Sequence, residues 1–433
     1  MAEVHPFRGW RYDVSQVGDL SDVTCPPYDV IDAAFQERLY QRHPCNVIRL
    51  ELNRAEPGDP GPDERYRRAA EFLRRWTQQR VLIQEHEAAL YGYHQVFEWE
   101  GQSYTRRGFL GRIRLERFGE GKVFPHEQTL SGPKADRLKL LDACRMNLSP
   151  IFGLYPDEGN KVQAPLEEAI TAITPLEATD DLGVVHRMWP VSNHSVVDRV
   201  RQLLRDKPIF IADGHHRYET AINYRDAQSS AGKLAGPEAP PNFVMMMFVG
   251  MSDPGLVILP THRLVGGIKA LSKDDLAGAL GRHFALKPVG QGPAAARETW
   301  DLIAADAGQS VMGLGTTADG AWTLALLTDG SPMKRLAPDQ SDDWRALGVS
   351  LLHKLVLEHL LKRFHQPAPQ CRYVHRVDEV IDAQTAGEVP LACLIPPAQI
   401  DDVERIAARL EKMPPKSTYF YPKLQTGLVF NPV

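Results

Sequence analysis

Residues 207–226 read KPIFIADGHHRYETAINYRD. The apolar run at 209–212 predicts a buried strand, because short apolar runs bounded by turn residues are typical of strands covered on both faces. Asp213 and Gly214 predict a turn, and the polar segment that follows predicts a helix near 216–227. We therefore expect a strand, a turn and a helix, with two histidines and an arginine where the helix begins.

This arrangement is typical of an anion site. The backbone N–H groups of Gly214, His215 and His216 would lie at the helix N-terminus, where unpaired donors and the helix dipole attract negative charge. Arg217 could bind two phosphate oxygens with its planar guanidinium, and the imidazoles could donate, accept or shuttle a proton. We predict that these four residues bind a phosphate group or a nucleotide.

Two other interpretations stay open for the same residues. Asp213 could cap the helix, His215 could pair with Glu219 one turn later, and Arg217 could be a solvated charge. A metal site is less favoured, because adjacent histidines on a regular helix point to different faces.

A second chemistry-bearing segment begins GKVFPHEQTLSGPKADR. His126 and Glu127 supply a potential base and a carboxylate, and Lys134 and Arg137 supply cations at the start of a predicted helix. Such a set suits phosphoryl chemistry, in which cations hold the oxygens and a base accepts a hydroxyl proton. Surface ion pairs and a structural hydrogen bond are the alternative interpretation.

Two further segments are rich in proline. TCPPYDVI, residues 24–31, predicts a rigid turn that presents Tyr28 and Asp29 as candidate substrate contacts, or a purely structural turn. MPPKSTYFYPKLQTGLVF, residues 413–430, includes Lys423 and could close over a site or pack the last strand.

Composition limits the functional classes. The chain has 433 residues, 43% of them hydrophobic, and a formal net charge of −5. This size predicts two or three domains, and without a basic block nucleic-acid binding is not favoured.

The five cysteines form no CxxC pair, which argues against a disulfide framework and a thiolate zinc site. Neither a signal pattern nor an apolar run of about 18 residues occurs, so we expect a cytoplasmic protein without a membrane partner.

Missing motifs exclude several enzyme classes. The sequence contains no GxxxxGK[ST], no GxGxxG that opens a helix, no HExxH and no GxSxG. Kinases with the standard phosphate loop, dinucleotide dehydrogenases, zincins and α/β-hydrolases are therefore not favoured.

The predicted strands and helices alternate irregularly, which indicates an α+β (mixed α/β) fold. We expect a boundary near Gly266. It would divide the chain into an N-terminal domain, 1–265, that carries the phosphate site, and a C-terminal α/β region, 266–433.

Five segments in order resemble a bacterial and archaeal family catalogued as domain of unknown function 1015. They are TCPPYDVI, HEQTLSGPKADRL, NLSPIFGLY, ADGHHRYETA and MPPKSTYFYPKL. The resemblance extends over about residues 8–431 and implies no activity by itself.

The strand followed by DGHHR is also similar to the ligand-binding motif of the ParB and sulfiredoxin superfamily, which includes free serine kinases. This resemblance implies a ParB-like core and phosphate contacts from residues 214–217. It places Asp213 near the substrate or its magnesium. The serine kinases carry a catalytic glutamate upstream of the motif, and Glu127 is our candidate because it lies upstream among cations.

We therefore predict a kinase-like phosphotransferase that acts on a small hydroxylated metabolite, with serine or phosphoserine as the leading candidate. Glu127 or His126 would accept the hydroxyl proton, Mg²⁺ would bridge phosphate oxygens, and ATP, ADP or pyrophosphate would be the donor. A phosphate-ester hydrolase and a non-enzymatic nucleotide-binding regulatory module are the alternatives. The sequence does not indicate the oligomeric state.

Overall fold

The computed structural model describes residues 2–127 and 131–433. The chain forms two compact units, which we call unit 1 and unit 2. The domain boundary expected near Gly266 lies inside the strand β14 (His262–Ile268), and the division of the chain at that residue stays a prediction. Unit 1 comprises Met1–Pro125, Thr129–Val257 and Pro422–Val433, and unit 2 comprises His126–Gln128 and Ile258–Tyr421.

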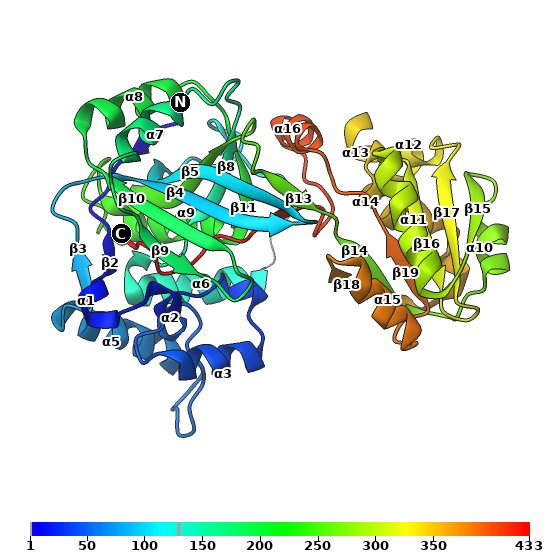
Figure 1. Ribbon diagram of the computed structural model, residues 1–433, viewed down its shortest axis with the longest axis horizontal. Helices are drawn as coiled ribbons and strands as arrows, with labels where there is room; N and C mark the ends of the chain where they lie inside the picture. Colours follow the sequence, from blue (N-terminus) through cyan, green and yellow to red (C-terminus); the bar gives the residue numbers. More distant parts are fainter. Residues whose placement is uncertain (1, 128–130) are drawn as a thin grey trace. The chain divides into compact units, whose positions relative to one another are not determined.

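Unit 1 contains a nine-stranded mixed sheet, counted over the described residues (Figure 1). The strand order is β6-β11-β8-β12-β5-β4-β10-β9, and β1 pairs with β5. The pairs β11–β6 and β12–β8 are parallel, and the other pairs are antiparallel. The strands are β1 (Val4–His5), β4 (Leu90–Trp99), β5 (Gln102–Arg114), β6 (Val123–Phe124), β8 (Ile151–Tyr155), β9 (Leu176–Thr179), β10 (Val185–Val191), β11 (Ile209–Asp213) and β12 (Phe243–Gly250).

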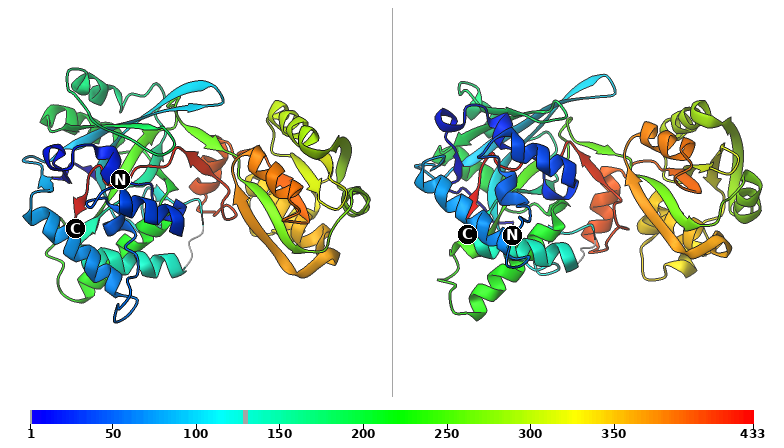
Figure 2. Two further views of the ribbon diagram at one scale, coloured as in Figure 1. Left: turned by 60° about the horizontal axis from the view of Figure 1, so that its bottom comes forward. Right: turned by 90° about the horizontal axis from the view of Figure 1, so that it is seen from below.

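Helices cover both faces of this sheet. Alternate residues of β12, among them Val244 and Met246, belong to one core with side chains of α7 (Ala164–Ile170), α8 (His194–Leu204) and α9 (His215–Ser230). Figures 1 and 2 show α7 and α8 on one side of the sheet and α5 and α6 on the other. This cover explains why β12 is buried along its whole length and apolar throughout.

The remaining elements of unit 1 are short helices and two-stranded ribbons. The helices are α1 (Val14–Val17), α2 (Leu20–Val23), η1 (Tyr28–Val30), α3 (Ala33–Arg42), α4 (Ile48–Glu51), α5 (Glu64–Gln78), α6 (Ser131–Cys144) and η2 (Pro240–Asn242). The ribbons pair β2 (Trp10–Tyr12) with β3 (Leu82–Gln84), and β7 (Met146–Asn147) with β21 (Asn431–Pro432).

Unit 2 contains an antiparallel sheet in the order β15-β17-β16-β19-β14-β18. Ile303 of α11 and Val380 of α15 belong to the core on one face, and Leu352 and Leu355 of the π-helix η3 belong to the core on the other. The strands are β13 (Val257–Leu259), β14 (His262–Ile268), β15 (Phe284–Gln291), β16 (Val311–Thr316), β17 (Ala321–Leu327), β18 (His365–Val374), β19 (Leu391–Leu394) and β20 (Tyr419–Tyr421). The helices are α10 (Lys273–Leu280), α11 (Gly292–Asp306), α12 (Pro332–Leu336), α13 (Asp342–Ala346), α14 (Gly348–Ser350), η3 (Leu351–Leu360), η4 (Lys362–Phe364), α15 (Val377–Thr385) and α16 (Ile400–Ala408).

Each unit thus combines helices with a sheet that is wholly or largely antiparallel, and the α+β class is confirmed. Within the described ranges, no helix has both the length and the apolar character that a membrane crossing requires.

Candidate functional site

The turn between β11 and α9 has the geometry that the sequence predicts. β11 ends at Asp213, Gly214 adopts a left-handed conformation with φ 90°, and α9 begins at His215. No side chain caps the helix, so the interpretation of Asp213 as an N-cap is wrong. An added Cβ at Gly214 would lie 3.1 Å from Cζ, Nε and Nη2 of Arg217. The Arg217 guanidinium therefore lies against the start of α9, and a side chain at position 214 would displace it by a few tenths of an ångström.

Two cations hold the Asp213 carboxylate. Arg217 Nη2 donates to Oδ2 at 2.7 Å, and Lys423 Nζ donates to Oδ1 at 2.6 Å. Only 19% of the Asp213 side chain is exposed, with 12% for Arg217 and 14% for Lys423. Burial opposes ionisation of Asp213, but the fields of Lys423 and Arg217 outweigh it and hold its pKa well below the usual range.

A third cation, Arg106, influences the same carboxylate. Its guanidinium is fully buried, lies 4.7 Å from the Phe152 ring centroid, and donates to Gln95 and to the Pro422 carbonyl. Burial lowers the pKa of Arg106 to about 10, although the negative charge of Asp213 acts to raise it. The Asp213 carboxylate thus binds two cations directly beside the N-terminus of α9, and Arg106 acts on it as a further positive charge.

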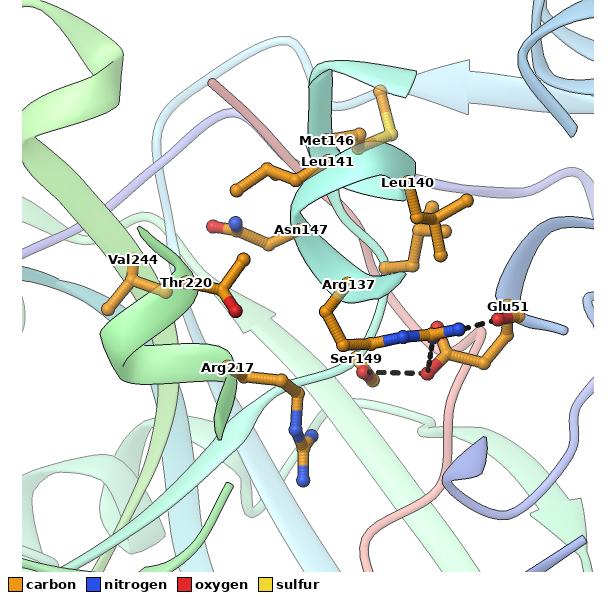
Figure 3. A pocket seen from close by; sticks show the side chains of 11 residues that line it. Glu51, Arg137, Leu140, Leu141, Met146, Asn147, Ser149, Arg217, Thr220 and Val244 are labelled. Atoms are coloured by element: carbon orange, nitrogen blue, oxygen red, sulfur yellow. Dashed lines mark hydrogen bonds and ion pairs between the residues drawn. The ribbon is translucent and has the colours of Figure 1, made fainter. Parts of the chain in front are cut away.

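A small cavity of about 50 Å³ adjoins Arg217 (Figure 3). Its polar wall includes Arg137, Glu51 and Ser149, together with Arg217. Arg137 Nη1 lies 3.3 Å from Glu51 Oε1, and Ser149 Oγ donates to the same oxygen at 3.2 Å. Such a volume holds a few water molecules or one small functional group rather than a nucleotide.

Tyr28 of η1 lies beside this wall. The Arg137 guanidinium lies 4.2 Å from the centroid of the Tyr28 ring, a cation–π contact. Burial raises the pKa of Tyr28 to about 12, although the positive charge of Arg217 opposes the rise. Asp29, the other predicted substrate contact, is exposed. The predicted residues Tyr28, Arg137 and Arg217 are therefore neighbours in unit 1.

Lys134 forms an ion pair with a residue of the same helix as the DGHHR motif. Its Nζ lies 2.7 Å from Glu219 Oε2, which joins α6 to α9. Arg137 Nη2 also lies 2.6 Å from Asp136 Oδ2. Both cations thus form ion pairs, but Arg137 is buried and lines the cavity, so its pairs are not those of a surface network. Phosphate contacts from Lys134 and Arg137 stay a prediction.

The predicted proton acceptors belong to unit 2. His126 is buried, and its Nε2 lies 2.8 Å from Thr418 Oγ1. Glu127 Oε1 accepts a hydrogen bond from the Lys416 backbone at 2.9 Å, and its negative charge acts on Arg263. Residues 128–130 of this motif lie outside the described residues. A catalytic role for His126 and Glu127 stays a prediction.

Four residues around the site have no ligand or catalytic role in the sequence analysis: Lys423, Glu51, Ser149 and Arg106. Lys423 and Ser149 lie in segments that resemble the family, whereas Glu51 and Arg106 lie in none of these segments. The PKL sequence among aromatics was the only signal for Lys423, whereas nothing local distinguishes Glu51 from a surface carboxylate.

Asp213, as arranged here, does not fit a magnesium ion. Both of its oxygens accept hydrogen bonds from cations, and Mg²⁺ prefers carboxylates whose oxygens face it directly. Among the described residues, no group of three or more His, Cys, Asp or Glu side chains could hold a metal. Magnesium bound to the phosphate oxygens of a ligand stays a prediction.

Comparison with known proteins establishes the family. The sequence matches DUF1015, described as a protein of unknown function, over residues 4–350, and the chain belongs to this family, as the motifs predicted. No curated protein matches the chain.

Similar solved structures include a free serine kinase variant in complex with AMP, at 10% identity and a TM-score of 0.33, covering 71% of this chain and 89% of that chain. A conserved hypothetical protein from Pyrococcus furiosus has 12% identity and a TM-score of 0.32, with 71% and 92% covered. C-terminally truncated SbnI from Staphylococcus aureus has 10% identity and a TM-score of 0.34, with 74% and 87% covered. At these TM-scores the similarity carries no argument about activity.

Proposed function

We propose that this member of the DUF1015 family binds the phosphate group of a small molecule at the start of α9 and transfers a phosphoryl group to a hydroxylated metabolite. Serine or phosphoserine is the leading candidate substrate, and ATP, ADP or pyrophosphate the candidate donor. The observation that carries the proposal is the placement of two cations, Arg217 and Lys423, on the Asp213 carboxylate beside the N-terminus of α9.

Cations near the transferred phosphoryl group would stabilise the negative charge that its oxygens carry during the reaction. Phosphoryl transfer spreads negative charge over the oxygens of the transferred group, and preorganised cations and N–H groups stabilise it. The acceptor oxygen would bond to phosphorus as the bond to the leaving oxygen breaks. The hydroxyl proton would pass to Glu127 or His126, the acceptors we propose. Lys134 and Arg137 are proposed as further phosphate contacts.

Binding is the first test. Calorimetric titration of the full chain with ATP, ADP and pyrophosphate, with and without magnesium, should give binding that Arg217→Ala weakens about 10- to 100-fold, the loss of one charge-assisted interaction. Arg225→Ala is the matched control, since it removes the same charge from α9 where Arg225 donates to the Leu115 carbonyl. Unchanged affinity in Arg217→Ala would refute the proposed site.

Turnover is the second test. Transfer to serine that needs both donor and acceptor indicates a kinase, release of phosphate from phosphoserine alone indicates a hydrolase, and binding without turnover indicates a regulatory module. Glu127→Gln should slow transfer by about 100-fold or more while the Kd for the donor stays unchanged, because a base acts only on the chemical step. An unaltered rate would exclude Glu127 as the base.

A further inference from the structure

We infer that Lys423 is a ligand-binding residue of the phosphate site, which exchanges the Asp213 carboxylate for a phosphoryl oxygen when the ligand binds. This inference rests on the proposed function. It assigns a role to the C-terminal segment that returns to unit 1 from Pro422 onward.

The backbone around Lys423 is held by groups from the sheet. Arg106 donates to the Pro422 carbonyl, Gln95 Nε2 donates to the Lys423 carbonyl at 2.8 Å, and the Gln425 N–H donates to Tyr93 Oη at 3.2 Å. Arg106, Gln95 and Tyr93 are all fully buried. These hydrogen bonds hold the backbone at Lys423 in place. The Lys423 side chain can therefore move away from Asp213 without a movement of the backbone.

Lys423 is the cation of this cluster best suited to such an exchange. Arg106 is fully buried and bound to Gln95 and a carbonyl, so it cannot turn toward a ligand. Arg217 is bound by the Pro150 carbonyl as well as by Asp213. The Lys423 and Arg217 side chains are exposed to a similar extent, but the Lys423 ammonium is a compact charge on a flexible stem with three rotatable donors, which suits it to a change of partner.

The charges of the groups involved favour the exchange of Asp213 for a phosphoryl oxygen as the partner of Lys423. In the free site Lys423 and Arg217 share the single negative charge of Asp213. A phosphoryl group carries more than one negative charge, so it is the stronger partner for the ammonium, and Asp213 keeps Arg217 after Lys423 has moved. Asp213 accordingly acts as an internal competitor of the ligand. This consequence separates ligand binding by Lys423 from a merely structural ion pair.

The test is calorimetric titration of the full chain with pyrophosphate. Lys423→Met should weaken binding about 10- to 100-fold, as expected for one charge-assisted contact, and Lys423→Arg should restore part of it. Asp213→Asn should tighten binding, because it releases the ammonium. Lys207→Met is the matched control, because Lys207 is a half-buried lysine of unit 1 that lies 3.3 Å from Asp157.

The outcomes distinguish the two proposals. If Arg217→Ala binds pyrophosphate more weakly but Lys423→Met binds it as tightly as the native chain, Lys423 has only a structural role. That result refutes the inference and leaves the proposed function intact. If Asp213→Asn binds no more tightly than the native chain, the exchange is refuted even should Lys423→Met fail to fold. If the native chain binds no phosphate ligand, both proposals fall.

Discussion

Replacing Gly214 by alanine perturbs the turn between β11 and α9, against which the Arg217 guanidinium lies. At φ 90° the residue lies in the left-handed region, which costs an L-residue about 1–2 kcal/mol. The new Cβ would also lie 3.1 Å from three atoms of the Arg217 guanidinium. Because carbon atoms prefer separations of about 3.5–4.0 Å, the guanidinium must move away by a few tenths of an ångström.

The substitution should change both the stability of unit 1 and its affinity for pyrophosphate. Gly214→Ala should lower the free energy of unfolding of unit 1 by about 1–2 kcal/mol through the backbone alone. It should also weaken pyrophosphate binding, because a displaced guanidinium loses some or all of a charge-assisted hydrogen bond of about 1.5–3 kcal/mol. At about 1.4 kcal/mol for each factor of ten, the full loss corresponds to about 10- to 100-fold in Kd.

Gly58→Ala is the matched control. Gly58 has φ 93°, and beyond its chain neighbours no atom lies within 4 Å of the position that an added Cβ would take. The substitution therefore imposes the same backbone cost without touching Arg217. Urea denaturation followed by tryptophan fluorescence measures stability, and calorimetric titration measures affinity. The reasoning is refuted if Gly214→Ala retains full affinity, or if Gly58→Ala loses as much.

Three further predictions concern substitutions of residues around the site. Asp213 has a lower pKa in the folded than in the unfolded chain, so its carboxylate stabilises unit 1 above pH ~4 and this contribution is lost as the pH falls further. The difference in Tm between the native chain and Asp213→Asn should therefore shrink from about pH 7 to about pH 3, and a constant difference would contradict this. Arg137→Met should destabilise unit 1 by about 3–5 kcal/mol in urea denaturation, because it leaves the buried Glu51 carboxylate without its cation. Adding Glu51→Gln should recover part of the loss, and strictly additive effects would argue against coupling. Tyr28→Phe and Asp29→Asn should raise the KM for the hydroxylated substrate without altering the pyrophosphate Kd, and a changed Kd would place these residues at the phosphate instead.

Local patterns in the sequence determined the elements that carry the site. The apolar run before Asp213 became β11, and the Asp-Gly pair became the turn into α9. Both signals are local, because a strand covered on both faces needs a continuous apolar run and a left-handed turn residue favours glycine. The motif residues Gly214 and Arg217 could therefore be recognised without any knowledge of the fold.

The partners of those residues were decided only by the tertiary structure. Lys423 reaches Asp213 from 210 residues further along the chain. Glu51 meets Arg137 and Ser149 from a separate element. Long-range pairs of this kind leave no periodic signal, because each partner looks like an ordinary polar residue in its own segment. The same holds for His126 and Glu127, which the sequence places beside Lys134 but the structure assigns to unit 2.

The family, the α+β class and the turn from β11 into α9 could therefore be predicted from the sequence, since they depend on residue types in a fixed local order. The contact of one carboxylate with both Arg217 and Lys423 emerged from the fold alone. The physical reason is that electrostatic environment depends on distance and burial, which folding sets and residue order does not.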